Sequence, residues 1–145
     1  MKSFLKTSSL LKAATAFAFL LFVSSGLKAQ NAYVTNYSSV EMIVTVYGAT
    51  TCVAGEYDCE ATEVIPAATS SGPGQATIAL SCLGSYVVTA EVDENNSSNI
   101  GVVLKTPNCL CGQGAATDSD SFSSSGGTIT ADAACSGQDM TIEIN

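Results

Sequence analysis

The sequence predicts an all-β protein, an antiparallel Greek-key β-sandwich of the immunoglobulin-like or a related type, with about seven or eight short strands and disulfide cross-links. Three observations lead to this prediction. Short stretches alternate between apolar and polar residues, turn-rich segments separate them, and all six cysteines lie in the same part of the chain. A small β-barrel is the alternative arrangement of the same strands.

The chain begins with a segment typical of a secretory signal peptide. Three lysines precede an uncharged, mostly apolar run at 13–23, and small residues follow as far as Ala29. This order is that of a signal peptide, and the run is shorter than the roughly 20 residues that span a bilayer. We therefore expect a signal peptide at 1–29, a single secreted domain at 30–145 and no membrane span. The domain would lie in the periplasm, at the cell surface or outside the cell.

Clear strand patterns recur along the predicted domain. They lie at 40–47, 75–82, 85–93, 99–105, 128–132 and 140–144. In the first stretch, Met42, Val44 and Val46 fall on one face and polar or mixed residues on the other, and such period-two alternation is typical of half-buried strands. Weaker patterns lie at 32–37 and 61–65. Together these stretches account for the expected number of strands, with no convincing helix between them.

Turn-forming residues fill the gaps between these stretches. Ser, Gly, Pro and Asn dominate at 70–74, 95–99 and 123–127, and these residues are typical of turns. Many short strands at such spacing favour a sandwich. The chain has no Trp, so the tryptophan that packs on the immunoglobulin disulfide is missing, and the related sandwich types stay open.

All the cysteines are expected to form disulfides, because an even number in a small exported domain is typical of a disulfide framework. The cysteines are Cys52, Cys59, Cys82, Cys109, Cys111 and Cys135. The spacing favours a Cys52–Cys59 pair, since these two bracket a short loop that contains glycine. Cys109 and Cys111 are too close in sequence to pair comfortably with each other, so we expect each to pair with one of the two remaining cysteines.

The charge of the predicted domain is strongly negative. Beyond residue 29 there is one lysine, Lys105, against thirteen acidic residues, a net charge of −12. Phosphate backbones and anionic membrane surfaces repel such a surface, which argues against nucleic-acid binding. A cationic partner or a divalent cation would be favoured.

The residue types also argue against an enzyme. The chain has no His and no Arg, so it can form neither a Ser–His pair nor a Cys–His pair, nor a bidentate clamp for phosphate. A Ser–Lys pair would have to use Lys105, which ends a predicted strand. We therefore expect a non-catalytic protein.

Calcium is the candidate cofactor, and we expect no other. Asp93, Glu94 and Asn95 form a loop dense in oxygen ligands, and Asp118 and Asp120 add two carboxylates two residues apart. Calcium takes six to eight oxygen ligands of these types. The EF-hand pattern is not met, so the expectation rests on composition.

Aromatic and acidic side chains form the candidate binding surface. Its members are Tyr33, Tyr37, Tyr47, Glu56, Tyr57 and Asp58. The first three tyrosines share a strand phase opposite to the core residues, so we expect them to line one exposed face. The other three side chains lie between two cysteines, where a cross-linked loop would expose its aromatic ring for recognition.

Two functions are compatible with these features. The first is a secreted, non-catalytic binding or adhesion module whose loops at 49–60 and 93–99 contact a glycan, a protein or a cation. The alternative is a structural subunit of a surface, matrix or filament assembly, built by strand-edge pairing. In that case the strands at the two ends of the domain would pair with neighbouring molecules.

Overall fold

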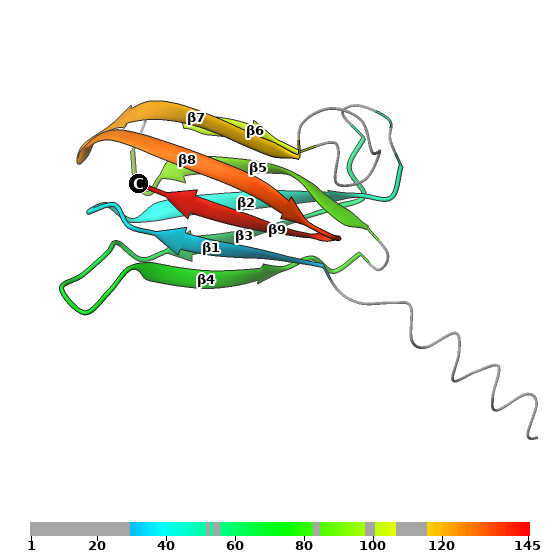
Figure 1. Cartoon of the computed structure of the whole chain (residues 1–145), viewed down its shortest axis with the longest axis horizontal. Coiled ribbons are helices and arrows are strands. Elements are labelled where there is room, and N and C mark those ends of the chain that lie inside the picture. Colours follow the sequence, from blue (N-terminus) through cyan, green and yellow to red (C-terminus); the bar gives the residue numbers. More distant parts are fainter. Residues whose placement is uncertain (1–29, 52, 54–55, 83–84, 98–100, 107–115) are drawn as a thin grey trace, which may run out of the picture.

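The computed structural model describes residues 30–51, 53, 56–82, 85–97, 101–106 and 116–145. This part of the chain folds into strands and contains no helix (Figure 1), so the all-β prediction is confirmed. The strands are β1 (Asn31–Asn36), β2 (Met42–Ala49), β3 (Cys59–Ile65), β4 (Gly74–Ala79), β5 (Tyr86–Glu94), β6 (Val102–Lys105), β7 (Thr117–Ser124), β8 (Gly127–Ser136) and β9 (Asp139–Ile144). The predicted signal peptide lies outside the described residues.

The strands form two sheets that pack face to face (Figure 1). The first sheet has the order β4-β1-β9-β8-β7, and the second sheet has the order β3-β2-β5-β6. Neighbouring strands are antiparallel except β1 and β9, which run parallel. The chain changes sheet after β1, β3, β4 and β6.

Alternating side chains from both sheets fill the core, as the sequence pattern predicts. On β2 the inward residues Met42, Val44 and Val46 are completely buried. The first sheet contributes Met140, Ile142 and other side chains to the same cluster. Burying a side chain of this size stabilises the fold by about 1.5–3 kcal/mol.

One strand was not predicted from the sequence. The segment of β7 is rich in Ser and Asp. Seven of its eight residues are exposed or half-buried, and Phe122 is the buried one. A strand with so few apolar side chains carries little periodic signal. Pairing with β8 along its whole length holds it in the sheet.

The strands at the two ends of the domain are both interior strands. β1 lies between β4 and β9, and β9 lies between β1 and β8. Their backbone groups are therefore engaged on both sides, so pairing with a neighbouring molecule in this arrangement would have to use an edge strand. The edge strands of the two sheets are β4, β7, β3 and β6.

Asn36 at the end of β1 holds the connection to β2. Its amide nitrogen donates to the carbonyl oxygens of Val40 and Pro66, at 2.8 and 2.9 Å, and its Oδ1 accepts from the backbone nitrogen and the hydroxyl of Ser38, at 3.0 and 2.6 Å. The side chain is completely buried. From this buried position it joins three backbone segments and satisfies its own polar atoms within the protein.

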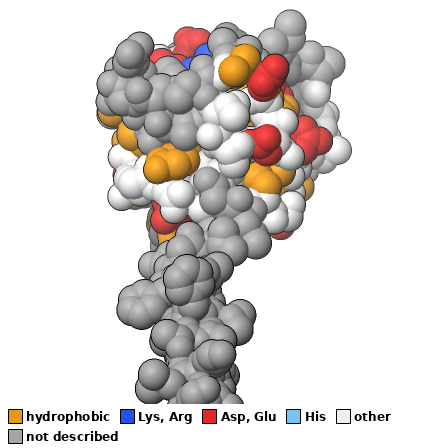
Figure 2. Space-filling model, turned by 90° about the vertical axis from the view of Figure 1, so that its right-hand side faces the viewer, with side chains coloured by type: hydrophobic (Ala, Val, Ile, Leu, Met, Phe, Trp, Pro, Cys, Tyr) orange, Lys and Arg blue, Asp and Glu red, His pale blue; other side chains and the backbone are white. Residues whose placement is uncertain are grey.

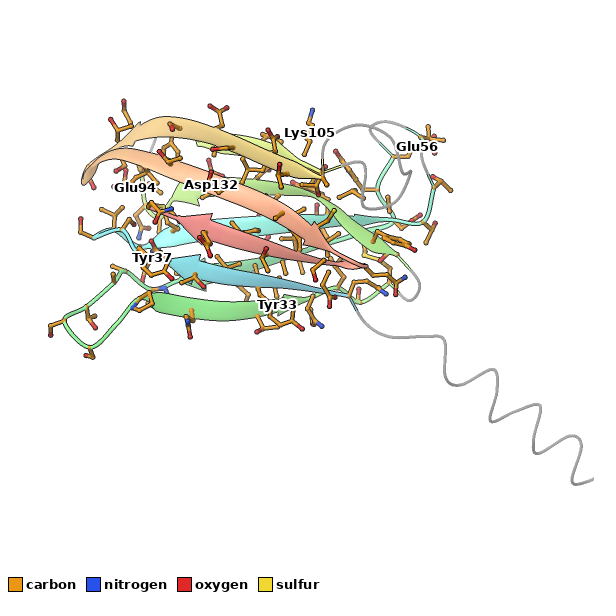
Figure 3. All side chains as sticks on the ribbon, in the orientation of Figure 1. Tyr33, Tyr37, Glu56, Glu94, Lys105 and Asp132 are labelled. Atoms are coloured by element: carbon orange, nitrogen blue, oxygen red, sulfur yellow. A yellow bond between two sulfur atoms is a disulfide. The ribbon has the colours of Figure 1, made fainter. Side chains whose placement is uncertain are left out.

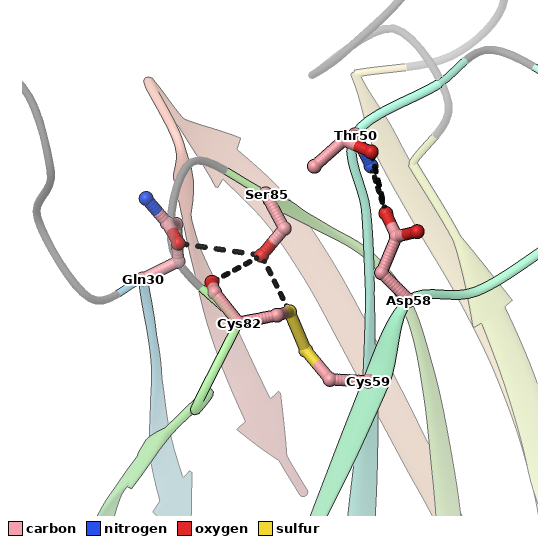
Figure 4. Close-up of a disulfide and its surroundings, with 6 residues drawn as sticks. All are labelled: Gln30, Thr50, Asp58, Cys59, Cys82 and Ser85. Carbon is pink, nitrogen blue, oxygen red and sulfur yellow. Dashed lines mark hydrogen bonds between the residues drawn. A yellow bond between two sulfur atoms is a disulfide. The ribbon is translucent and has the colours of Figure 1, made fainter.

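A disulfide joins Cys59 to Cys82 (Figure 4), which corrects the Cys52–Cys59 pair expected from spacing. Cys59 begins β3 in the second sheet, and Cys82 follows β4 of the first sheet. β3 and β4 lie together at one side of the sandwich, a proximity that sequence spacing does not reveal. The hydroxyl of Ser85 lies 2.9 Å from the Cys82 sulfur and 3.3 Å from Oε1 of Gln30.

The remaining cysteines are placed as follows. Cys135 on β8 is a free, half-buried thiol within the described part of the chain. Cys52, Cys109 and Cys111 lie outside the described residues. The structure therefore contains one disulfide among the described residues. Because Cys82 is bonded to Cys59 and Cys135 is free, the expected links from Cys109 and Cys111 to these two cysteines are wrong.

Candidate binding face

Two tyrosines come together on the outer face of the second sheet. Tyr47 points outward from β2, and Tyr57 lies in the connection that leads into β3. Their ring centroids are 4.9 Å apart and the ring planes are inclined by 36°. The hydroxyl of Tyr57 lies 3.2 Å from the hydroxyl of Thr89 on β5. These contacts fix the Tyr57 ring, although 42% of the residue is exposed.

The connection that carries Tyr57 is closed by the next residue, Asp58 (Figure 4). The backbone nitrogen and the hydroxyl of Thr50 donate to one Asp58 carboxylate oxygen at 2.5 and 2.7 Å, and the Asp58 backbone nitrogen donates to the Gly48 oxygen at 2.8 Å. Asp58 is therefore engaged in holding the loop. Glu56 is exposed at the same end of the molecule (Figure 3), and its backbone nitrogen donates to the Val53 oxygen.

Glu91 on β5 also belongs to this site, although the sequence pattern does not single it out. The Tyr47 hydroxyl donates to a Glu91 carboxylate oxygen at 2.9 Å. Partial burial, this bond and the negative charges of Glu91 and Glu60 raise the pKa of Tyr47 to about 12. Glu91 shares the outward phase of Asp93, but only the pairing of β5 with β2 shows which of them meets the tyrosine.

Hydroxyl groups and a lysine surround the tyrosine pair. Thr62, Thr45 and Glu91 lie in register across β3, β2 and β5, and the two threonine hydroxyls are 2.8 Å apart. Lys105 on β6 is exposed and lies opposite Thr89, the residue whose hydroxyl contacts the Tyr57 hydroxyl. We call this surface the tyrosine face, defined by Thr45, Tyr47, Tyr57, Thr62, Glu91 and Lys105.

The bond between Tyr47 and Glu91 predicts a late step in the alkaline titration of the protein. Below pH 10 both the folded and the unfolded chain keep the Tyr47 proton. Between pH 10 and about 12 the folded chain keeps this proton and the unfolded chain loses it. The contribution of the raised pKa to the free energy of unfolding is therefore complete below pH 10 and is lost as the pH rises to about 12. We expect the Glu91→Gln variant to lower the pKa of Tyr47, as measured by the ultraviolet absorbance of tyrosinate. Tyr47→Phe identifies the step by removing it, and an unchanged step in Glu91→Gln would contradict the bond.

Tyr33 and Tyr37 do not share a face with Tyr47, which corrects the expectation of a single tyrosine-lined surface. Tyr33 lies on β1, and Tyr37 follows that strand, so both belong to the first sheet (Figure 3). They are 45% and 52% exposed. The shared strand phase indicated correctly that these side chains point away from the core, but not which sheet each strand joins. Within the described residues, Tyr47 and Tyr57 are the one pair of aromatic rings in contact.

The outer face of the first sheet has a different character. Asp132 on β8 and Glu143 on β9 lie directly opposite each other, and Ser119 and Thr141 join them around a shallow depression of about 530 Å³. Like charges opposite each other on neighbouring strands repel. Tyr33 lies on this face without a ring partner among the described residues.

The first group of candidate calcium ligands is used in protein contacts. Glu94 is 8% exposed and accepts bonds from the backbone nitrogen and the hydroxyl of Ser125 in the β7–β8 turn. Asn95 donates to the carboxylate of Glu41, and Asp93 accepts from a backbone nitrogen of the segment before β6. Glu94 thereby joins the two sheets at one end of the sandwich (Figure 3). Residues 98–99 of the loop proposed at 93–99 lie outside the described residues.

The second group of candidate ligands lies away from the first. Asp118 accepts from the backbone nitrogen of Lys105 at 2.8 Å, and Lys105 lies at the end of the sandwich opposite to Glu94 (Figure 3). Asp120 accepts from the backbone nitrogen of Ser121 at 2.8 Å. The structure thus does not bring the two groups together, and within the described ranges no three His, Cys, Asp or Glu residues cluster for a metal ion.

No protein-family model, no curated protein and no solved structure matches this chain. Within the part of the chain that the structure describes, no helix has the length and apolar character needed to cross a membrane.

Proposed function

We propose that this chain is a secreted, non-catalytic binding or adhesion module and that the tyrosine face is its binding surface. The observation that carries the proposal is the Tyr57 ring, which is fixed by Tyr47 and Thr89 and yet exposed. A ring that is already immobilised loses little conformational freedom when a ligand binds, and the contact area it offers is therefore used efficiently.

The scaffold that we propose is a Greek-key sandwich of the immunoglobulin-like or a related type. Repeated changes of sheet along the chain support it, because Greek-key connections cross between sheets in this way. Export by the segment at 1–29 is compatible with the Cys59–Cys82 disulfide, since disulfides persist in oxidising compartments.

The chemistry of the tyrosine face supports binding rather than catalysis. The raised pKa of Tyr47 keeps its hydroxyl protonated at neutral pH, so it is a poor general base. The chain has no His and no Arg. Glu91 and Lys105 remain as a hydrogen-bond acceptor and a hydrogen-bond donor beside an aromatic ring.

An array that carries both glycans and extracellular proteins tests this function. We expect the protein to bind at least one of the arrayed molecules and to leave it chemically unchanged. Tyr57→Ala should reduce that signal at least tenfold, because removing a central aromatic contact commonly costs 2 kcal/mol or more.

Tyr33→Ala is the matched control, since it removes an equally exposed tyrosine from the opposite face. A signal that depends on Tyr33 and not on Tyr57 would place binding on the first sheet and refute the proposal. Both variants must show the thermal unfolding of the unmodified protein before their signals are compared.

A further inference from the structure

We propose that the ligand of the tyrosine face is an uncharged hexose polysaccharide, held along an internal stretch of its chain. This inference rests on the proposed function and adds the chemical class of the ligand. It follows from the aromatic ring, from the polar groups beside it and from the charge of the protein.

The Tyr57 ring has the properties needed to pack against a sugar ring. Its hydroxyl is engaged with Thr89 and its ring contacts Tyr47, so its position is set before binding. The negative π-face of an aromatic ring attracts the positive edge of C–H groups, and the C–H groups on one side of a hexose ring form such a surface. The exposed part of Tyr57 thus matches the apolar side of a sugar.

The polar groups around the ring match sugar hydroxyls, which both donate and accept. The Glu91 carboxylate is positioned by the bond from Tyr47 and has a second oxygen to accept from a ligand. Lys105 can donate, and the hydroxyls of Thr45 and Thr62 can do both. A hydrogen bond to a charged group, such as the Glu91 carboxylate or the Lys105 ammonium, is about twice as strong as one between neutral groups.

The charge of the protein selects against acidic polysaccharides. The whole chain has a net charge of −8, and Glu60 and Glu91 lie on either side of Tyr47 in the second sheet. Lys105 alone cannot neutralise a polyanion. An uncharged chain meets no repulsion, so its binding should be nearly independent of salt.

The exposed apolar groups are too scattered for a typical protein interface. Besides Tyr57, the outer face of the second sheet exposes Val64 on β3 and Val103 on β6, which lie on opposite edge strands. Figure 2 shows, at one end of the molecule, small hydrophobic groups separated by acidic and other polar side chains. A stable protein interface buries about 800 Å² on each partner around an apolar core.

The open position of the ring favours the interior of a polysaccharide over its end. Tyr57 lies on the outer face of a sheet, beside rows of residues that continue across β3, β2, β5 and β6. A chain can lie across such a surface and extend beyond it on both sides. Affinity should therefore rise from disaccharide to hexasaccharide and should not depend on the reducing end.

Isothermal titration with soluble oligosaccharides tests the inference. The probes are cellohexaose, mannohexaose, galactohexaose and hexa-N-acetylchitohexaose as uncharged chains, their disaccharides, and oligogalacturonate as the acidic comparison. We expect binding of at least one hexasaccharide, at least tenfold weaker binding of its disaccharide and less than a twofold change when salt rises from low to physiological strength. Tyr57→Ala should weaken binding at least tenfold, and Glu91→Gln at least threefold. Tyr33→Ala should leave binding unchanged.

Three results would overturn the inference: no binding of any uncharged hexasaccharide, preference for oligogalacturonate, or binding that persists in folded Tyr57→Ala protein. If the array nevertheless shows Tyr57-dependent binding to a protein, the proposed function stands and only the ligand class is wrong. If no binding on the array depends on Tyr57, both are wrong. Glu91→Gln preserves the size of the side chain, so it keeps the test decisive if Tyr57→Ala fails to fold.

Discussion

Replacing both Cys59 and Cys82 with serine is expected to lower the free energy of unfolding by about 3 kcal/mol. The disulfide closes a loop with a sequence separation of 23 residues, and such a cross-link restricts the unfolded chain. The two cysteines also pack against the hydrophobic core, so serine would leave a polar group there. Urea unfolding of the double variant and of the unmodified protein measures the difference.

Cys135→Ser is the control for this experiment. Cys135 is a free thiol on β8, so its replacement should change the free energy of unfolding by less than about 1 kcal/mol. A reducing agent should destabilise the unmodified protein too, because it opens the same link. Equal stability of the double variant and the unmodified protein would show that the Cys59–Cys82 link is not the one that stabilises the fold.

Replacing Asn36 with alanine is expected to lower the free energy of unfolding by about 3 kcal/mol as well. The variant would remove a completely buried amide that bonds the carbonyls of Val40 and Pro66 and the backbone nitrogen of the buried Ser38. Each buried polar group that loses its partner costs about 1–3 kcal/mol. Thermal and urea unfolding provide the measurement.

Asn95→Ala is the matched control for Asn36, because it also removes a side-chain amide. The bond from Asn95 to Glu41 is exposed, and water can replace it, so its loss should cost less than about 1 kcal/mol. If Asn36→Ala and Asn95→Ala had the same small effect, Asn36 would not organise the β1–β2 connection as described.

The core was predictable from the sequence because it depends on local alternation. The inward positions of Met42, Val44 and Val46 follow from period two alone, and the structure buries all three. β7 escaped prediction because its strand is held by pairing with β8 and not by apolar side chains of its own. The predicted number of strands was therefore close to the observed one, because most strands carry apolar alternation and β7 does not.

The candidate site was predictable only in part, because it depends on which strands become neighbours. Tyr57 was singled out for its place in a loop, and the structure gives it an exposed, fixed ring. Tyr33 and Tyr47 have the same phase but lie in different sheets, and Glu91 meets Tyr47 through the register of β2 and β5. Non-local pairing of this kind leaves no mark in a single sequence.

The tyrosine face is the proposed ligand-binding surface, and amide NMR shifts measured during a titration locate the bound ligand residue by residue. The titrant is the molecule that gives the strongest signal on the array. We expect the largest shifts at Tyr47, Tyr57 and Glu91, with small ones on the outer face of the first sheet. Largest shifts around Tyr33 or Asp132, with the tyrosine face unchanged, would contradict it.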